Sequence, residues 1–211
     1  MRVFRSVILS GLAAAALSTP ALAASNIIPG NVSSVSVSGT AGVLRDATWS
    51  SGSTPSSTSA PFTGTPQADG TQWNHGSFWW DQDPSVNTSP VSLTVDLNKS
   101  YKITQFTVQA DDNDTYLLQY WNGTSWATAW NIPEYGSYGL TTRVSGLLGP
   151  ITTDALRFTA TGGDNYYALG QLEAVGVPAG VPEPASWALM ILGVAGTGAA
   201  LRLRRSAVIT A

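Results

Sequence analysis

Cysteine is absent from this 211-residue sequence, and histidine occurs once, as His75. The lack of cysteine excludes a disulfide framework, a thiol nucleophile, cysteine-bound zinc and iron–sulfur clusters. A single histidine also excludes a histidine-rich metal site.

Charge is also scarce, because only 11% of the residues are Asp, Glu, Lys or Arg. The net charge of −3 understates how acidic the middle is, since half of the ten basic residues lie near the two ends. Between residues 24 and 182, five basic residues face twelve acidic ones. Binding to nucleic acid needs clustered cations. The composition therefore excludes nucleic acid as a partner and favours sugars, cations or other proteins.

The first 23 residues have the pattern of a secretory signal peptide. Arg2 and Arg5 precede an apolar stretch over residues 7–17, and Pro20 ends it. The stretch is too short to span a bilayer, and the Ala-Leu-Ala sequence that follows has the small-residue form of a cleavage site. The sequence predicts export of the rest after cleavage at Ala23, with Ala24 as the alternative cleavage position.

The C-terminal end has a proline-rich linker over residues 177–184, followed by an apolar segment over residues 185–205. Its first 17 residues would form a helix about 25 Å long, short for a bilayer span. The positive-inside rule predicts that the arginines after it stay cytoplasmic. These features predict a transmembrane helix in the inner membrane, with the preceding domain in the periplasm.

The order of elements at this end resembles the PEP-CTERM sorting signal. The residues that match are Pro182, Glu183 and Pro184, then the apolar helix, then Arg202, Arg204 and Arg205. The resemblance implies a Gram-negative bacterium that makes exopolysaccharide. It also implies recognition by exosortase, a membrane protease-transpeptidase. It covers only about residues 181–205 and implies nothing about the domain before it.

The middle, over residues 24–176, alternates apolar and polar residues in short stretches separated by turn residues. The clearest stretch is 91–97, and further strands are predicted at 35–37, 106–110, 116–120, 126–130, 156–159 and 167–175. Asn122-Gly123 predicts a hairpin that joins 115–121 to 125–130. Residues 50–59 contain only Ser, Thr, Gly and Pro, which is typical of a loop. The pattern predicts an all-β sandwich.

A second resemblance covers about residues 43–176. It rests on Asp-Gly-Thr-Gln-Trp at 69–73, Phe-Trp-Trp at 78–80, the strands at 93–97 and 103–110, and Gly-Gln-Leu-Glu-Ala-Val-Gly at 170–176. This order is similar to a discoidin, or factor 5/8 C-type, domain. The resemblance implies a jelly-roll sandwich of the galactose-binding-like fold. Members of that family often bind carbohydrates or lipid surfaces.

No pattern in the sequence predicts an enzyme. A Ser-His-Asp triad would need His75, which lies between Asn74 and Gly76 in a predicted loop, and no Gly-x-Ser-x-Gly turn is present. Phosphate-binding loops, dinucleotide fingerprints and histidine-based zinc motifs are also missing. We therefore expect a protein without catalytic activity.

Two calcium hypotheses arise from the acidic residues. Asp111-Asp112-Asn113-Asp114 is the densest acidic run, and it is either a turn or a set of oxygen ligands for calcium. The discoidin resemblance implies a different site, in which Asp69 and Glu173 hold a structural calcium ion.

Aromatic residues supply the predicted ligand site, because flat amphipathic rings on loops stack against sugars. We expect Trp121 and Trp130 to pack inside the core. Five residues in Gly- or Asn-rich segments are predicted ligand residues: Trp73, His75, Asn165, Tyr166 and Tyr167.

The sequence therefore predicts an exported, non-enzymatic carbohydrate-binding protein. A PEP-CTERM signal would anchor it in the inner membrane and then sort it to the cell surface or the extracellular matrix. The alternative is a structural protein of the exopolysaccharide or biofilm matrix with no dedicated ligand.

Overall fold

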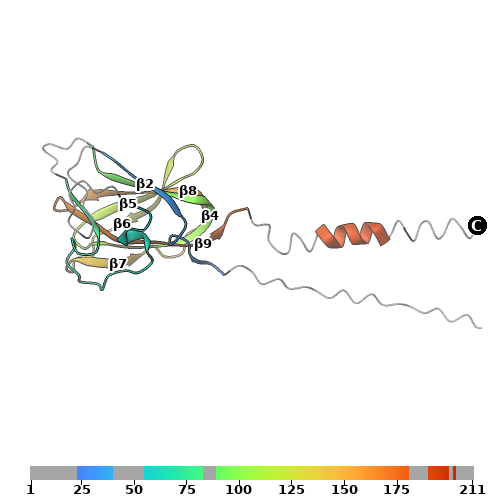
Figure 1. Cartoon of the computed structure of the whole chain (residues 1–211), viewed down its shortest axis with the longest axis horizontal. Coiled ribbons are helices and arrows are strands. Elements are labelled where there is room, and N and C mark those ends of the chain that lie inside the picture. Colours follow the sequence, from blue (N-terminus) through green and yellow to red (C-terminus); the bar gives the residue numbers. More distant parts are fainter. Residues whose placement is uncertain (1–22, 40–54, 83–88, 181–189, 200–201, 203–211) are drawn as a thin grey trace, which may run out of the picture. The chain divides into compact units, whose positions relative to one another are not determined.

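The computed structural model describes residues 23–39, 55–82, 89–180, 190–199 and 202. Residues 23–180 contain one compact unit, and the two ends of the chain form a separate unit. Nine strands and one 3-10 helix make up the described part of the compact unit (Figure 1). The strands are β1 (Ser25–Asn26), β2 (Val32–Ser38), β3 (Phe78–Asp81), β4 (Ser92–Asp111), β5 (Thr115–Trp121), β6 (Trp126–Ile132), β7 (Leu140–Val144), β8 (Ile151–Gly162) and β9 (Tyr166–Pro178). The 3-10 helix, η1, is Ala60–Phe62.

The strands form two antiparallel layers that share the long strand β4. The first half of β4 pairs with β2 and β8, and β5 and β6 continue this layer beyond β8. The second half of β4 pairs with β7 and β9, and β9 carries β1 and β3 on its other edge. Register shifts between Asp96 and Tyr101 mark the irregularity between the two halves. The described unit is therefore an all-β sandwich.

The core lies between the two layers, because side chains alternate sides along each strand. Leu93 and Val95 from the first half of β4 belong to the same buried cluster as Phe106 and Val108 from the second half. Burying each such side chain stabilises the fold by about 1.5–3 kcal/mol relative to leaving it exposed.

Large aromatic rings fill one region of this core. The Tyr116 ring stacks on the Phe158 ring with centroids 4.8 Å apart, and the Tyr167 ring meets Tyr116 edge-on at 6.2 Å. Trp80 contacts both Phe158 and Tyr167. These contacts hold β3, β5, β8 and β9 together across the sandwich.

The predicted strands agree with the structure at most positions. The hairpin at Asn122-Gly123 is confirmed, with β5 and β6 antiparallel and Trp121 opposite Trp126. The two strands predicted at 91–97 and 106–110 form one continuous strand, β4. The sequence pattern does not predict β1, β3 or β7. The placement of Trp121 in the core was wrong, because this side chain is only partly buried and lines a surface pocket.

Both ends of the chain lie largely outside the described residues. The predicted signal peptide falls on residues 1–23, of which only Ala23 is described, and the sorting residues Pro182, Glu183 and Pro184 are outside. Residues 190–199 of the predicted transmembrane segment are helical. Within the described residues, no helix is both long enough and apolar enough to cross a membrane. Of the Ser/Thr-rich loop predicted at 50–59, only residues 55–59 are described.

Candidate functional site

Four loops meet at one end of the sandwich, and backbone and side-chain hydrogen bonds join them. The loops are residues 69–76, 111–114, 133–140 and 163–166. The bonds that join them run from Leu140 N to Thr71 O (2.7 Å), from Tyr135 N to Asp112 O (2.8 Å) and from Asn113 Nδ2 to Asp164 Oδ2 (3.0 Å). Because each loop is tied to a neighbour, their side chains are held in one region of the surface.

Aromatic side chains gather on these loops. Tyr135, Tyr138 and Tyr166 are 66%, 67% and 50% exposed. The Trp73 ring is half-buried and lies 5.9 Å from the Tyr166 ring, at an interplanar angle of 37°. We call these four residues the aromatic rim. Among the described residues of the sandwich, the exposed large aromatic side chains all lie in this rim.

The base of the rim is packed against a second, smaller hydrophobic cluster. Trp73 meets the Trp79 ring edge-on at 5.1 Å, and it packs against a small cluster of Trp79, Leu140 and Ala168. One face of the indole is therefore supported from below, while Tyr166 lies beside it. A ring held in this way loses little conformational freedom when a ligand stacks on it.

The structure brings four of the five predicted ligand residues to this end. His75 is exposed two residues after Trp73, and Asn165 is exposed and directly precedes Tyr166. Asn165 has φ of +78°, and its carbonyl accepts a hydrogen bond from Gln82 N at 2.9 Å. Tyr167 is different: it is 5% exposed and belongs to the core, so it presents no surface for a ligand.

The sequence analysis missed Tyr135 and Tyr138. Both lie in the segment Pro-Glu-Tyr-Gly-Ser-Tyr-Gly over residues 133–139. Aromatic residues among glycines were the signal that selected Trp73 and Tyr166, and the same signal is present here. The turn-forming Gly136 and Gly139, with φ of +69° and +66°, mark this segment as a loop.

The acidic run lies beneath the rim and is largely buried. Asp111, Asp112 and Asp114 are 2%, 7% and 0% exposed. Burial raises the pKa of Asp111 to about 7 and that of Asp114 to about 8, because desolvation disfavours the charged carboxylate. The Tyr116 hydroxyl donates to Asp114 Oδ2 at 2.9 Å, which lowers the pKa of Asp114 by a smaller amount.

Arg143 is the cation that faces this acidic group. It is 5% exposed, its Nη2 donates to the Asp111 carbonyl oxygen, and its guanidinium carbon lies 5.9 Å from the centre of the Tyr116 ring. Its Nε and Nη1 have no hydrogen-bond partner. Desolvation lowers the pKa of Arg143, and the acidic neighbours oppose that shift. The turn interpretation of this run agrees with the structure, since residues 112 and 113 form the turn between β4 and β5.

Asp69 and Glu173 occupy different settings. Asp69 Oδ1 accepts hydrogen bonds from Gln109 Nε2 at 3.0 Å, Thr142 N at 3.1 Å and Thr142 Oγ1 at 2.7 Å. Glu173 is half-buried on β9 opposite Thr107, and burial raises its pKa. Because Asp69 Oδ1 already accepts three hydrogen bonds, this arrangement does not favour a cation at that oxygen. In the part of the chain that the structure describes, no group of three or more His, Cys, Asp or Glu side chains is placed to hold a metal. The calcium site stays a prediction.

Comparisons with known proteins give only distant similarities. No family model matches the chain. No curated protein matches it either. The family 32 CBM of Clostridium perfringens NanJ, solved with galactose, is 14% identical, with a TM-score of 0.47 over 72% of this chain and 98% of that one. The family 32 carbohydrate-binding module of Streptococcus pneumoniae EndoD is 16% identical, with a TM-score of 0.43 over 71% and 98%.

Chitosan-binding module 1 of a Paenibacillus chitosanase/glucanase is 18% identical, with a TM-score of 0.43 over 71% of this chain and 98% of that one. These three neighbours are binding modules. A further match, SpGH29, is 15% identical, with a TM-score of 0.42, and this chain covers 28% of its length. At such identities and TM-scores, the similarities carry no argument about the ligand of this chain.

Proposed function

We propose that this chain is an exported, non-catalytic carbohydrate-binding protein that grips a glycan with its aromatic rim. The observation that carries the proposal is the concentration of exposed rings at one end of the sandwich, on Tyr135, Tyr138 and Tyr166 beside Trp73. A soluble fold buries most of its large rings, as the core here does. Rings left exposed together on neighbouring loops are typical of a binding surface.

The chemistry of the rim suits a sugar. The faces of Trp and Tyr rings pack against the C–H groups of a pyranose, and the hydroxyl and indole N–H groups hydrogen-bond its oxygens. His75 and Asn165 add exposed polar groups beside Trp73 and Tyr166. The acidic character of the domain makes an anionic polymer a poorer partner than a neutral glycan.

The two-layer arrangement, with β4 shared between layers, also supports the discoidin-like jelly roll of the galactose-binding-like class. The fold proposal rests on strand pairing, and the ligand proposal rests on loop side chains. The two proposals are consistent with each other.

The proposal includes export and sorting, which rest on the sequence alone. Residues 1–23 direct export, and residues 182–205 act as the PEP-CTERM signal for an exosortase-type membrane protease. The chain first sits in the inner membrane with its domain in the periplasm. Sorting then delivers the domain to the cell surface or to extracellular polysaccharide.

A glycan array probed with the full chain tests the function. The parent protein is compared with Trp73→Ala and with Leu147→Ala, a control that removes an 85% exposed apolar side chain outside the rim. We expect binding to a defined set of glycans, lost in Trp73→Ala and kept in Leu147→Ala. If the folded parent binds no glycan, the proposal fails and a structural matrix role without a dedicated ligand is favoured.

A further inference from the structure

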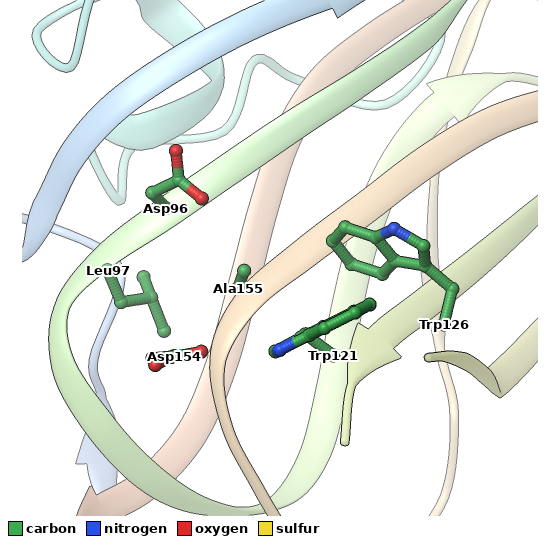
Figure 2. Close-up of a pocket in the computed structure, with 6 residues that line it drawn as sticks. All are labelled: Asp96, Leu97, Trp121, Trp126, Asp154 and Ala155. Carbon is green, nitrogen blue, oxygen red and sulfur yellow. The ribbon is translucent and has the colours of Figure 1, made fainter. Parts of the chain in front are cut away.

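A pocket of about 460 Å³ opens on the sandwich surface beside the β5–β6 hairpin, away from the aromatic rim. The acidic run at the rim end lies just before the start of β5, whereas this pocket lies at the end of the same strand, at Trp121. The pocket and the rim are therefore at opposite ends of β5. Its lining residues are Asp96, Leu97, Trp121, Trp126, Asp154 and Ala155. Figure 2 shows Asp96 and Asp154 on one side of the pocket and the two indoles on the other.

The two indoles form an angled pair of flat walls. Trp121 and Trp126 face each other across the hairpin register, with ring centroids 5.6 Å apart and planes at 63°. Both side chains are half-buried. Asn122 Oδ1 accepts hydrogen bonds from the backbone N–H groups of Thr124 and Ser125, which fixes the turn between them. The hairpin therefore presents both rings in a defined orientation.

Arg157 supports Trp126 from outside the pocket. Its guanidinium lies 4.6 Å from the centre of the Trp126 ring, a cation–π contact. Nε and Nη2 of the same group donate to Gln119 Oε1 at 2.9 and 2.6 Å. This contact holds the indole in place, and Arg157 is not among the residues that line the pocket.

The opposite side of the pocket carries negative charge without a matching cation. Asp154 is exposed and makes no hydrogen bond or ion pair with another described residue, and Asp96 is half-buried and accepts a hydrogen bond from the Ser34 hydroxyl. None of the described residues lining the pocket is Lys, Arg or His. A cationic ligand would supply the missing charge, whereas an anionic ligand would be repelled.

We propose that this pocket binds a protonated amino sugar, as a unit within a polysaccharide. The pyranose ring packs on the angled indoles, and its ammonium group pairs with Asp154 and Asp96. A cation next to an indole face gains further from the ring's negative charge density. The open pocket with two flat walls fits a ring better than the narrow stem of a lysine side chain. The site is separate from the rim and does not depend on the neutral glycan proposed there.

Calorimetric titration of the full chain with a β-linked glucosamine oligomer tests the site. The neutral N-acetylglucosamine oligomer of equal length is the matched ligand. At about pH 6, where an amine with a pKa close to that of an α-amino group, about 8, is protonated, the glucosamine oligomer should bind the pocket and the neutral oligomer should not, as read from the Trp121 and Trp126 indole signals. Raising the pH to about 9 should abolish binding at the pocket, because such an amine loses its proton.

Single-residue variants test whether the glucosamine oligomer binds in this pocket. Asp154→Asn changes an exposed side chain and should weaken binding about threefold or more, whereas Glu134→Gln, which removes an exposed charge elsewhere, should not change it. Trp126→Ala should weaken binding about tenfold. The indole N–H signals of Trp121 and Trp126 should also shift in NMR spectra when the oligomer is added, which reports on the site without a mutation.

Three results would overturn the proposal. The first is equal binding of the two oligomers. The second is an effect of Asp154→Asn no larger than that of Glu134→Gln. The third is tighter binding of a lysine tetramer than of a glucosamine tetramer, which would assign the pocket to a basic peptide.

Discussion

Asp111 and Asp114 carry the clearest consequence at the scale of single residues, because their pKa values are raised to about 7 and about 8. In the unfolded chain an ordinary Asp has a pKa of about 3.9. Between those values the folded protein holds protons that the unfolded chain has released. The unfolding free energy contributed by these groups is therefore fully present below about pH 4 and is lost as the pH rises to about 8.

We expect the melting temperature to fall between pH 5 and pH 8, with a loss of unfolding free energy on the order of 1 kcal/mol per pH unit from each of these two groups. Asp114→Asn keeps the side-chain shape and removes one titrating group, so it should flatten the dependence. Glu134→Gln, at an exposed position, serves as the control. Differential scanning calorimetry across this range measures the slope. A melting temperature that rises from pH 5 to pH 8 in the parent protein would contradict the account.

Asp69 gives a second prediction at this scale. Its Oδ1 ties the 69–76 loop to Gln109 and Thr142 through three hydrogen bonds. A hydrogen bond to a charged group contributes about 1.5–3 kcal/mol, and Asp69 is exposed, so water replaces most of the three bonds when the carboxylate is removed. We expect Asp69→Ala to cost about 2 kcal/mol of unfolding free energy, measured by urea denaturation.

Thermal melts with and without added calcium test the calcium site predicted at Asp69 and Glu173. An ion that binds only the folded state would raise the melting temperature.

Tyr166 and Tyr167 show the limit of sequence reasoning for single residues. Both were predicted as ligand residues, yet Tyr166 is 50% exposed and Tyr167 is 5% exposed. Adjacent residues of a strand point to opposite faces. At the start of β9 the two tyrosines are followed by Ala168, Leu169 and Gly170, which show no alternation of apolar and polar residues. The sequence therefore does not fix which tyrosine faces the core, and the packing of Trp80 and Tyr116 against Tyr167 decides it.

At the scale of elements, the 133–139 loop depends on the close approach of its backbone to the 69–76 loop. A Cβ on Gly139 would lie 2.2 Å from the Thr71 carbonyl oxygen, whereas a Cβ on Gly136 would meet nothing within 4 Å. Both glycines have positive φ. The two positions therefore carry the same kind of conformational strain and differ in the space available.

We expect Gly136→Ala to cost about 1 kcal/mol, from backbone strain alone. Gly139→Ala should cost about 2 kcal/mol or more, because the Leu140 N to Thr71 O bond must also lengthen. It should also weaken glycan binding, since Tyr138 moves with this segment. Chemical denaturation and a binding isotherm on both variants measure the two effects. Equal losses of stability would show that the clash is relieved elsewhere and that the loop contact is not limiting.

Strands with clear alternation were predictable, and short strands were not. The alternation over 91–97 and the Asn-Gly turn at 122–123 each encode their structure locally, through side-chain period and turn geometry. Strand β3, over Phe78–Asp81, shows no alternation because three of its residues are buried. It exists through its pairing with β9, which lies far along the sequence. The continuity of β4 was also missed, because its central irregularity is compatible with either a turn or a bulge.

At the scale of the whole molecule, we propose that the export and sorting segments at the two ends of the chain determine where the domain acts. A reporter fused after Arg205 should be cytoplasmic, and a reporter inserted into the 50–59 loop should be periplasmic, if residues 185–205 span the inner membrane. Replacing Pro182, Glu183 and Pro184 by Ala should leave export intact and retain the protein in the inner membrane. Both reporters on one side, or an unchanged distribution of the triple variant, would contradict this part of the proposal.

The central claim is that the aromatic rim holds the glycan. Isothermal titration of the best array ligand into the full chain, its Tyr166→Ala variant and its Leu147→Ala variant tests this claim most directly. Tyr166 is half exposed and contacts Trp73, so its loss should leave the melting temperature nearly unchanged. The account predicts affinity about tenfold weaker for Tyr166→Ala, or about 1.4 kcal/mol, and unchanged for Leu147→Ala. Equal affinity for all three folded proteins would contradict it.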